Sequence, residues 1–280
     1  MQRHYVASLA PHPILVTDTI TILRPEDSGA VIVSGSHGGV SSAQFVLGRK
    51  LAGVFFNDAG IGKDEAGVAG LHILDKVGLP AAAVDHASAA IGDGGDTWST
   101  GIISRANSRA TAAGVLPGQK VDKAAGILAR CPAVQTDGTH ASLNRQLRRL
   151  GGVDIVLLDS ISMLHAGEMG EVVVSGSHGG AVSAEFAARF RPLLTVFNDA
   201  GIGKYGAGCA ALDVLSRAQL AAVAVDCNSG RIGDPVDMLD FGIISRANTA
   251  AVGLGFAPGG ALRDAVVGLA RPPSFSPDGR

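Results

Sequence analysis

The sequence predicts an α/β fold: a tandem duplication of a Rossmann-like βαβ unit, with mainly parallel sheets in two lobes related by a pseudo-twofold axis. Two observations lead to this prediction. Three sequence motifs occur twice at a constant offset of 141 residues. Between the motifs, short apolar runs alternate with segments of helical length, the pattern of βαβ crossovers in a parallel sheet.

The repeated motifs are identical in both copies. Identity in one register over such a distance is not chance, so the halves share an ancestor and have diverged between the motifs. SGSHGG spans residues 34–39 and 175–180, NDAGIGK spans 57–63 and 198–204, and GIISRAN spans 101–107 and 242–248.

Composition excludes several classes of protein. The net charge is -2, from 23 basic and 25 acidic residues without a long run of either sign. We therefore expect no nucleic-acid groove and no polybasic membrane patch. No apolar run approaches the roughly 18 residues of a membrane helix, and the N-terminus lacks the apolar core of a secretory signal. The three cysteines lack the spacing of a disulfide framework, which indicates free thiols and predicts a soluble, cytoplasmic protein.

The strands of the first repeat, expected over residues 15–118, recur in the second, expected over 156–260. Alternating Thr or Ser with aliphatic residues predicts a half-buried strand at 16–23 and at 157–164. Continuous β-branched runs predict strands that are buried on both faces. The β-branched runs lie at 30–33 and 172–174. Two further apolar strands are expected in each repeat, at 53–56 and 81–84 in the first and at 194–197 and 222–225 in the second.

A helix is expected after each of these strands. The first lies at about 40–49 in one repeat and 181–190 in the other. The last is expected to begin with Asp93 or Asp234 as its N-cap and to include the GIISRAN motif.

The two repeats are expected to be joined by a linker over residues 119–155 and followed by a tail over 261–280. Within the linker, residues 121–129 and the basic segment 143–150 are candidate short helices. Three prolines after residue 270 predict an irregular tail.

The motifs fall at the ends of predicted strands. In open α/β sheets ligands collect at the carboxyl ends of the strands. SGSHGG, NDAGIGK and the loops that begin at Asp85 and Asp226 should therefore converge. A cleft between the lobes would bring both copies of each motif to one small-molecule site.

SGSHGG offers hydroxyls, imidazoles and backbone amides. Ser36 and Ser177 are candidate nucleophiles, and His37 and His178 are candidate catalytic groups. The glycine amides could face a carboxylate, a phosphate or a developing oxyanion, although a tight strand-to-helix turn is the alternative. The glycines assigned to ligand binding are Gly38, Gly39, Gly179 and Gly180.

NDAGIGK lacks the spacing of a mononucleotide P-loop. Its lysines, Lys63 and Lys204, stand where a helix should begin. A desolvated lysine there would have a lowered pKa, suited to a general base or to holding an anion, whereas a solvated surface lysine is the alternative. The residues assigned to ligand binding are Asn57, Asp58, Asn198 and Asp199.

The halves disagree where Asp85-His86 corresponds to Asp226-Cys227. A His opposite a Cys is expected if two equivalent positions face one substrate in different roles, so all four are candidate catalytic residues. Both are also mid-sized side chains that are often buried.

GIISRAN supplies Arg105 with Asn107, and Arg246 with Asn248, as candidate ligand-binding residues. Arg is a natural partner for a carboxylate, and an ion pair with Asp96 or Asp237 is the alternative. No His-x-x-x-His or Cys-x-x-Cys spacing is present, so we predict no metal and no cofactor.

These residues favour an enzyme that hydrolyses an amide- or imide-type C–N bond of a carbonyl- or carboxylate-rich metabolite. Ser36 or Ser177 would be the nucleophile, Lys63 or Lys204 the base, and glycine amides the oxyanion hole. The alternatives are a cofactor-independent isomerase, racemase or lyase that uses His86 and Cys227, and a non-catalytic anion-binding or regulatory protein. The sequence leaves a homo-oligomer open.

Overall fold

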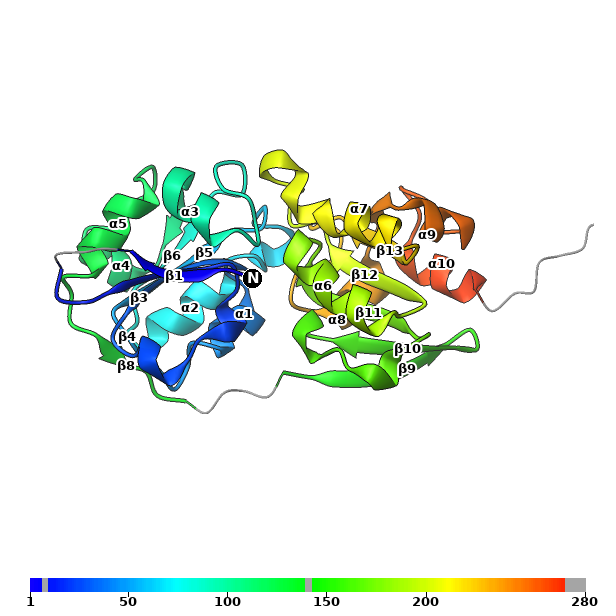
Figure 1. Ribbon diagram of the computed structural model, residues 1–280, viewed down its shortest axis with the longest axis horizontal. Helices are drawn as coiled ribbons and strands as arrows, with labels where there is room; N and C mark the ends of the chain where they lie inside the picture. The colour runs from blue at the N-terminus through cyan, green and yellow to red at the C-terminus, as the bar shows by residue number, and fades with distance from the viewer. Residues whose placement is uncertain (7–9, 139–142, 270–280) are drawn as a thin grey trace, which may run out of the picture.

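The computed structural model describes residues 1–6, 10–138 and 143–269, and it contains two six-stranded sheets, one in each half of the chain (Figure 1). In the first sheet the strands follow one another in chain order: β1 (Arg3–Val6), β2 (Ile14–Thr17), β3 (Val31–His37), β5 (Gly53–Asn57), β6 (Ala81–Val84) and β7 (Ile103–Ala106). The second sheet also follows chain order: β9 (Arg145–Leu150), β10 (Val153–Leu158), β11 (Val172–His178), β12 (Leu194–Asn198), β13 (Ala221–Val225) and β14 (Ile244–Ala247).

The four inner strands of each sheet are parallel, and the strands at both edges are antiparallel to them. The α/β class and the mainly parallel sheets are therefore confirmed. The strand order never reverses along either sheet. A Rossmann sheet has such a reversal, and its ligand crevice lies there. The Rossmann rule therefore does not locate a ligand site in this protein.

Helices cover both faces of the first sheet. Alternate residues of a strand point to opposite faces, and Phe56 accordingly packs in one apolar core while Phe55 packs in the other. On the Phe56 face lie α1 (Val40–Gln44) and α2 (Ala69–Lys76). The Phe55 core includes residues of α4 (Ser108–Ala112) and α5 (Val121–Leu128), and α3 (Gly94–Thr100) packs against it.

The second half repeats this three-layer arrangement. Its helices are α6 (Ala181–Phe190) and α7 (Ala210–Arg217) on one face, and α8 (Pro235–Phe241), α9 (Thr249–Gly253) and α10 (Leu262–Gly268) on the other. Asp93 and Asp234 cap α3 and α8 by accepting the backbone N–H of Asp96 and of Asp237, which confirms them as N-caps.

Two predicted elements differ from the structure. The SRA residues of GIISRAN form the edge strands β7 and β14 instead of continuing a helix. The basic segment expected as a helix forms β9, which pairs with β10 over its whole length. In both places a neighbouring strand offers unpaired backbone groups, and pairing with it outweighs a weak local helical pattern.

The expected strand at 16–23 also ends early. Strand β2 stops at Thr17, and a short 3₁₀ turn, η1 (Ile20–Ile22), follows because the Thr19 hydroxyl accepts the N–H of Thr21. The equivalent turn is η4 (Ile161–Met163). The remaining short elements are η2 (Pro25–Asp27), β4 (Lys50–Leu51), η3 (Lys63–Glu65), β8 (Val134–Gln135), η5 (Ala166–Glu168) and η6 (Lys204–Cys209).

The segments outside the two expected repeats belong to the folded halves. Helix α5 packs in the core of the first half, β9 joins the second sheet, and α10 packs in the second core. Residues 270–280 of the expected irregular tail lie outside the described residues.

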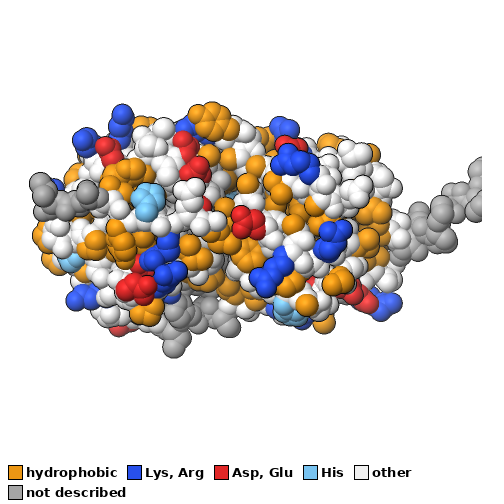
Figure 2. Space-filling view, in the orientation of Figure 1, with side chains coloured by type: hydrophobic (Ala, Val, Ile, Leu, Met, Phe, Trp, Pro, Cys, Tyr) orange, Lys and Arg blue, Asp and Glu red, His pale blue; other side chains and the backbone are white. Residues whose placement is uncertain are grey.

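Within the described part of the chain, no helix is both long and apolar enough to cross a membrane. On the face shown in Figure 2, acidic and basic side chains are interspersed.

Candidate active site between the two halves

Each SGSHGG motif ends the central strand of its sheet in a buried, irregular turn. The register of β3 with β5 shifts between Val33 and His37, and the Gly92 N–H donates to Gly35 O at 2.8 Å. A Cβ on Gly35 would lie 2.6 Å from the Asp93 nitrogen. Glycine is therefore required here because the backbone before α3 presses against the motif.

The two motif serines each accept a backbone hydrogen bond from the preceding 3₁₀ turn. Ser36 Oγ accepts the Ile20 N–H at 3.0 Å, and Ser177 Oγ accepts the Ile161 N–H at 2.9 Å. Both side chains are buried. The hydroxyls are thus held in fixed positions, and the Ser36 hydroxyl itself donates to Thr19 Oγ1 at 3.4 Å.

The motif histidines have a defined tautomer. The Gly39 N–H donates to His37 Nδ1 at 3.1 Å, and the Gly180 N–H donates to His178 Nδ1 at 3.0 Å. Nδ1 is an acceptor in both rings, so the proton of the neutral imidazole lies on Nε2.

Burial keeps both imidazoles neutral. His37 is 5% and His178 is 8% exposed. Burial lowers the pKa of His37 to about 3, helped by the nearby His178, and it lowers the pKa of His178 to about 4. At neutral pH each ring therefore presents an uncharged Nε2–H donor.

Both pairs of Ser and His line a single cavity between the halves. Its volume is about 40 Å³, room for about three water-sized groups. In the part of the chain that the structure describes, neither His37 Nε2 nor His178 Nε2 donates to another residue. The cavity is also lined by Thr19, Ser41, Ser42, Ser160 and Ser183, with Phe45 and Phe186 from equivalent helices.

Each histidine is covered by a glycine turn of the opposite half. A Cβ on Gly92 would lie 3.2 Å from His178 Cε1, and one on Gly233 would lie 3.7 Å from His37 Cε1. The cavity is thus completed only by both halves together.

The glycine amides of the motif are not free to bind a ligand. Gly38 donates to Asn57 O at 2.8 Å and Gly179 donates to Asn198 O at 2.9 Å. The next amides, those of Gly39 and Gly180, donate to the histidine rings. These four amides therefore do not form the expected oxyanion hole.

The NDAGIGK motifs form tight loops in which Asn and Asp hold the backbone. Asn57 Oδ1 accepts the Ala59 N–H, and Asp58 Oδ1 accepts the N–H groups of Gly60 and His86. Asn198 and Asp199 make the corresponding bonds to Ala200, Gly201 and Cys227. All four side chains are buried, and their hydrogen bonds to backbone N–H groups stabilise the loops.

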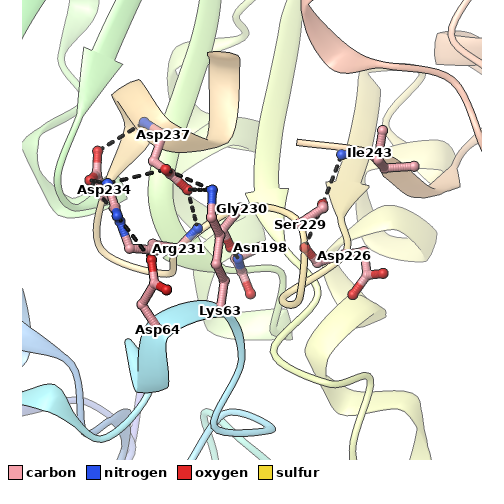
Figure 3. Close-up of polar contacts among 10 residues, drawn as sticks. All are labelled: Lys63, Asp64, Asn198, Asp226, Ser229, Gly230, Arg231, Asp234, Asp237 and Ile243. Carbon is pink, nitrogen blue, oxygen red and sulfur yellow. Dashed lines mark hydrogen bonds and ion pairs between the residues drawn. The ribbon is translucent and has the colours of Figure 1, made fainter. Parts of the chain in front are cut away.

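The lysines of NDAGIGK cross to the opposite half. Lys63 Nζ lies 2.9 Å from Asp237 Oδ1, a carboxylate that also binds Arg231 (Figure 3). Lys204 Nζ lies 2.7 Å from Asp96 Oδ1. The backbone crosses in the same way: Lys63 N–H donates to Cys227 O and Lys204 N–H donates to His86 O, each at 2.8 Å.

These ion pairs do not fit the expectation that Lys63 or Lys204 acts as a general base. The hydrogen bond to Asp96 raises the pKa of Lys204, whereas a general base needs a lowered one. Neither lysine hydrogen-bonds to a motif serine within the described chain.

The diverged pair, His86 and Cys227, lies at the contact between the halves and outside the cavity lining. His86 Nδ1 is 2.9 Å from Asp58 Oδ1, and this hydrogen bond raises the pKa of His86. Burial raises the pKa of the Cys227 thiol to about 12, so it stays protonated at neutral pH. Cys227 Sγ would lie 3.3 Å from a Cβ on Gly60 of the other loop.

Two groups of side chains in the described chain could hold a metal ion, since their ligand atoms lie within 4.8 Å of one another. They are Asp58 with Asp85 and His86, and Asp199 with Asp226 and Cys227. Asp58 and Asp199 already accept backbone amides of their own loops.

The GIISRAN residues lie away from the cavity. Asn107 caps α4 and Asn248 caps α9. Both side chains therefore stabilise helix ends. Arg105 and Arg246 are exposed on the edge strands. Arg246 lines a separate open groove of about 760 Å³ together with Tyr205.

Several residues of the cavity were not predicted from the sequence. Ser41 and Ser42 near the start of α1, and Ser183 near the start of α6, have buried side chains. The sequence shows them only as serines near the start of an expected helix, which does not reveal that they are buried in a cavity. A comparison of this chain with protein-family models, curated proteins and solved structures found no match.

Proposed function

We propose that this chain is an enzyme that binds a small carbonyl-bearing metabolite between its halves and hydrolyses an amide- or imide-type C–N bond. One observation supports the proposal above the others: two neutral histidines, each with an unpaired Nε2–H in the described chain, line one cavity beside two serines. Neutral imidazole donors stabilise the negative charge that develops on a carbonyl oxygen when a nucleophile adds.

The proposal gives each cavity group one role. Ser36 or Ser177 is the nucleophile: its Oγ bonds to the carbonyl carbon, and its proton passes to the nitrogen as the C–N bond breaks. A water molecule then hydrolyses the resulting ester and restores the serine hydroxyl. His37 and His178 hold the carbonyl oxygen. Lys63 and Lys204 tie the halves together through their carboxylate partners, so in this proposal they no longer act as bases. The substrate is a small molecule, and no cofactor takes part.

The proposal treats the chain as a tandem duplication with a pseudo-twofold axis through the cavity. Support comes from the crossing contacts of the two lysines, because the Lys–Asp ion pair and the lysine backbone hydrogen bond each occur in both directions. The three cysteines are free thiols, the state expected in the cytoplasm, where we place the protein.

The test is product analysis with a panel of linear amides, cyclic amides and imides. We expect Ser36→Ala or Ser177→Ala to lower turnover by at least about 100-fold. Ser99→Ala is the matched control, since Ser99 is exposed and bonds within α3.

Unchanged turnover in both cavity variants would refute a serine nucleophile. Thermal stabilisation by a panel compound without product would instead identify a binding protein.

A further inference from the structure

A second pocket of the first half lies away from the cavity between the halves. It is found at the amino ends of β3 and β5, where the Gly29 N–H donates to Lys50 O at 2.7 Å. Ser36 and His37 of the cavity are at the carboxyl end of β3. The pocket has a volume of about 230 Å³, nearly six times that of the cavity, and no described residue lines both.

The lining of this pocket has an excess of positive charge. The described ionisable residues of the lining are Arg24, Arg49, Lys50 and Asp27. Asp27 is buried and already has partners of its own, because its carboxylate forms an ion pair with Arg3 and accepts the Tyr5 hydroxyl at 2.6 Å. Three cations therefore face the pocket against one carboxylate whose charge is already balanced.

Arg49 is the most firmly placed of the three cations. Its Nε donates to Phe45 O at 2.8 Å and its Nη2 donates to Leu23 O at 3.4 Å. The side chain is partly buried, and within the described chain it forms no ion pair with a carboxylate. A guanidinium has five N–H donors, so two backbone carbonyls orient the group and leave donors for a ligand. A bound anion would stabilise this uncompensated charge.

The two other cations are exposed side chains at the mouth of the pocket. Lys50 has no carboxylate partner within the described chain, and Arg24 lies 3.6 Å from Glu26 in a pair that water largely screens. Both can therefore turn toward an anion held by Arg49.

The positive charge of the pocket is not a requirement of the repeated fold. At the positions 141 residues further along the chain, Phe190 stands in place of Arg49 and Met169 in place of Ser28. The linker also builds one wall in the first half, because Gln135 of β8 lines the pocket and β8 pairs with β4 (Figure 1). The second half therefore forms the same layers without these groups, which favours a ligand-binding role for Arg49.

We propose that this pocket binds the phosphate group of a small ligand. A guanidinium binds two phosphate oxygens at once, and a lysine adds a point charge. A phosphate group carries up to two negative charges, so it matches three cations better than a carboxylate does. The volume beyond the phosphate holds the group that carries it. The proposal does not depend on hydrolysis in the cavity between the halves.

The first experiment measures binding to the full-length protein by calorimetry in a dilute buffer without phosphate. The ligands are inorganic phosphate, glycerol 3-phosphate and acetate. We expect the two phosphates to bind at least about 10-fold more tightly than acetate. Tighter binding of glycerol 3-phosphate would identify a phosphorylated metabolite as the ligand, and tighter binding of inorganic phosphate would identify the free ion. Acetate binding as tight as that of the phosphates, or no binding of either phosphate at about 10 mM, overturns the proposal.

The second experiment uses variants of the lining. We expect Arg49→Met to weaken phosphate binding by at least about 10-fold and Lys50→Met by about 3-fold or more. Arg49→Lys keeps the charge without the planar fork and should lie between Arg49→Met and the natural protein. Arg189→Met is the matched control, because it removes an exposed arginine of the second half and should leave phosphate binding unchanged.

Lys50→Met keeps the test decisive if Arg49→Met fails to fold, because Lys50 is exposed. Undiminished phosphate binding by a folded Arg49→Met or Lys50→Met protein overturns the proposal. An equal loss in Arg189→Met would show general attraction to the protein's charge and would overturn it too.

The serine variants separate this pocket from the cavity between the halves. We expect Ser36→Ala and Ser177→Ala to bind phosphate as the natural protein does, whatever their effect on amide turnover. Loss of phosphate binding in these variants would place the anion in the cavity and overturn the proposal. Failure of the panel amides to react would contradict the proposed hydrolysis and leave the phosphate pocket standing.

Discussion

The imidazoles of His37 and His86 carry their hydrogen-bonding groups in opposite directions. A backbone amide donates to His37 Nδ1, whereas His86 Nδ1 faces the carboxylate of Asp58. In its neutral form His86 therefore offers a lone pair at Nε2, and His37 offers a proton there. One residue type thus becomes an acceptor or a donor according to the group beside its inner nitrogen.

The stability of the protein should depend on pH through His37 and His178. Their pKa values are lowered to about 3 and about 4 in the folded state, while an unfolded histidine takes up a proton near pH 6.5. Between these values the unfolded state binds more protons, so stability falls as pH decreases from about 6.5, by up to about 1.4 kcal/mol per pH unit for each histidine. His86, whose pKa is raised, contributes in the opposite direction, its stabilisation being lost as pH rises through its folded pKa.

Urea unfolding between pH 7 and pH 5 measures this dependence. The double variant with His37→Asn and His178→Asn should lose less stability over that interval than the natural protein. An identical pH dependence in both proteins would show that the two histidines are not the groups responsible.

At the scale of elements, the loops after β5 and β12 are tightly folded. Ala59 and Ile61, and likewise Ala200 and Ile202, all have positive φ, which is strained for residues with a Cβ. The same strain in both loops indicates that the surrounding contacts, including those across the interface, hold each loop in place.

Replacement of Gly208 by Ala should be strongly destabilising. A Cβ there would lie 1.9 Å from Asp199 O, a backbone atom that cannot move aside. We expect a loss of about 2–4 kcal/mol in the free energy of unfolding. Gly126→Ala in α5 is the control, because that position has no neighbour within 4 Å, and it should gain about 0.5–1 kcal/mol. Equal effects of the two substitutions on the urea midpoint would contradict this account.

The elements show what the sequence can predict. The buried strand expected at residues 53–56 and the helix expected at 181–190 follow from continuous or periodic apolar residues, and both form, as β5 and α6. GIISRAN has no such signal, because its strand depends on pairing with β6, which is distant in sequence. The convergence of Ser36 and His37 with their counterparts on one cavity follows from strand ends. The donor character of the histidines does not, because it depends on two backbone amides.

At the scale of the molecule, the lysine ion pairs should contribute to holding the halves together. Lys204 and Asp96 are 15% and 17% exposed, so their interaction is only partly screened by water. A double-mutant cycle with Lys204→Met and Asp96→Asn should give a coupling free energy of about 1–2 kcal/mol. Lys76→Met, an exposed position on α2, is the control.

The same variants separate a structural from a catalytic lysine. We expect Lys204→Met to lower the unfolding midpoint while turnover of a panel substrate changes by less than about 10-fold. A loss of turnover of 100-fold or more in a folded variant would restore Lys204 as a base.

The crossed backbone bonds of Lys63 to Cys227 and of Lys204 to His86 have an evolutionary consequence. Contacts that run from one copy to the equivalent place in the other are those of an isologous dimer. A protein with a single copy of the three motifs should therefore form a twofold homodimer and build the same cavity across its subunit interface. In the duplication that we propose, fusion of two such genes would free each half to change alone. The difference between His86 and Cys227 is one that a homodimer of identical chains cannot have.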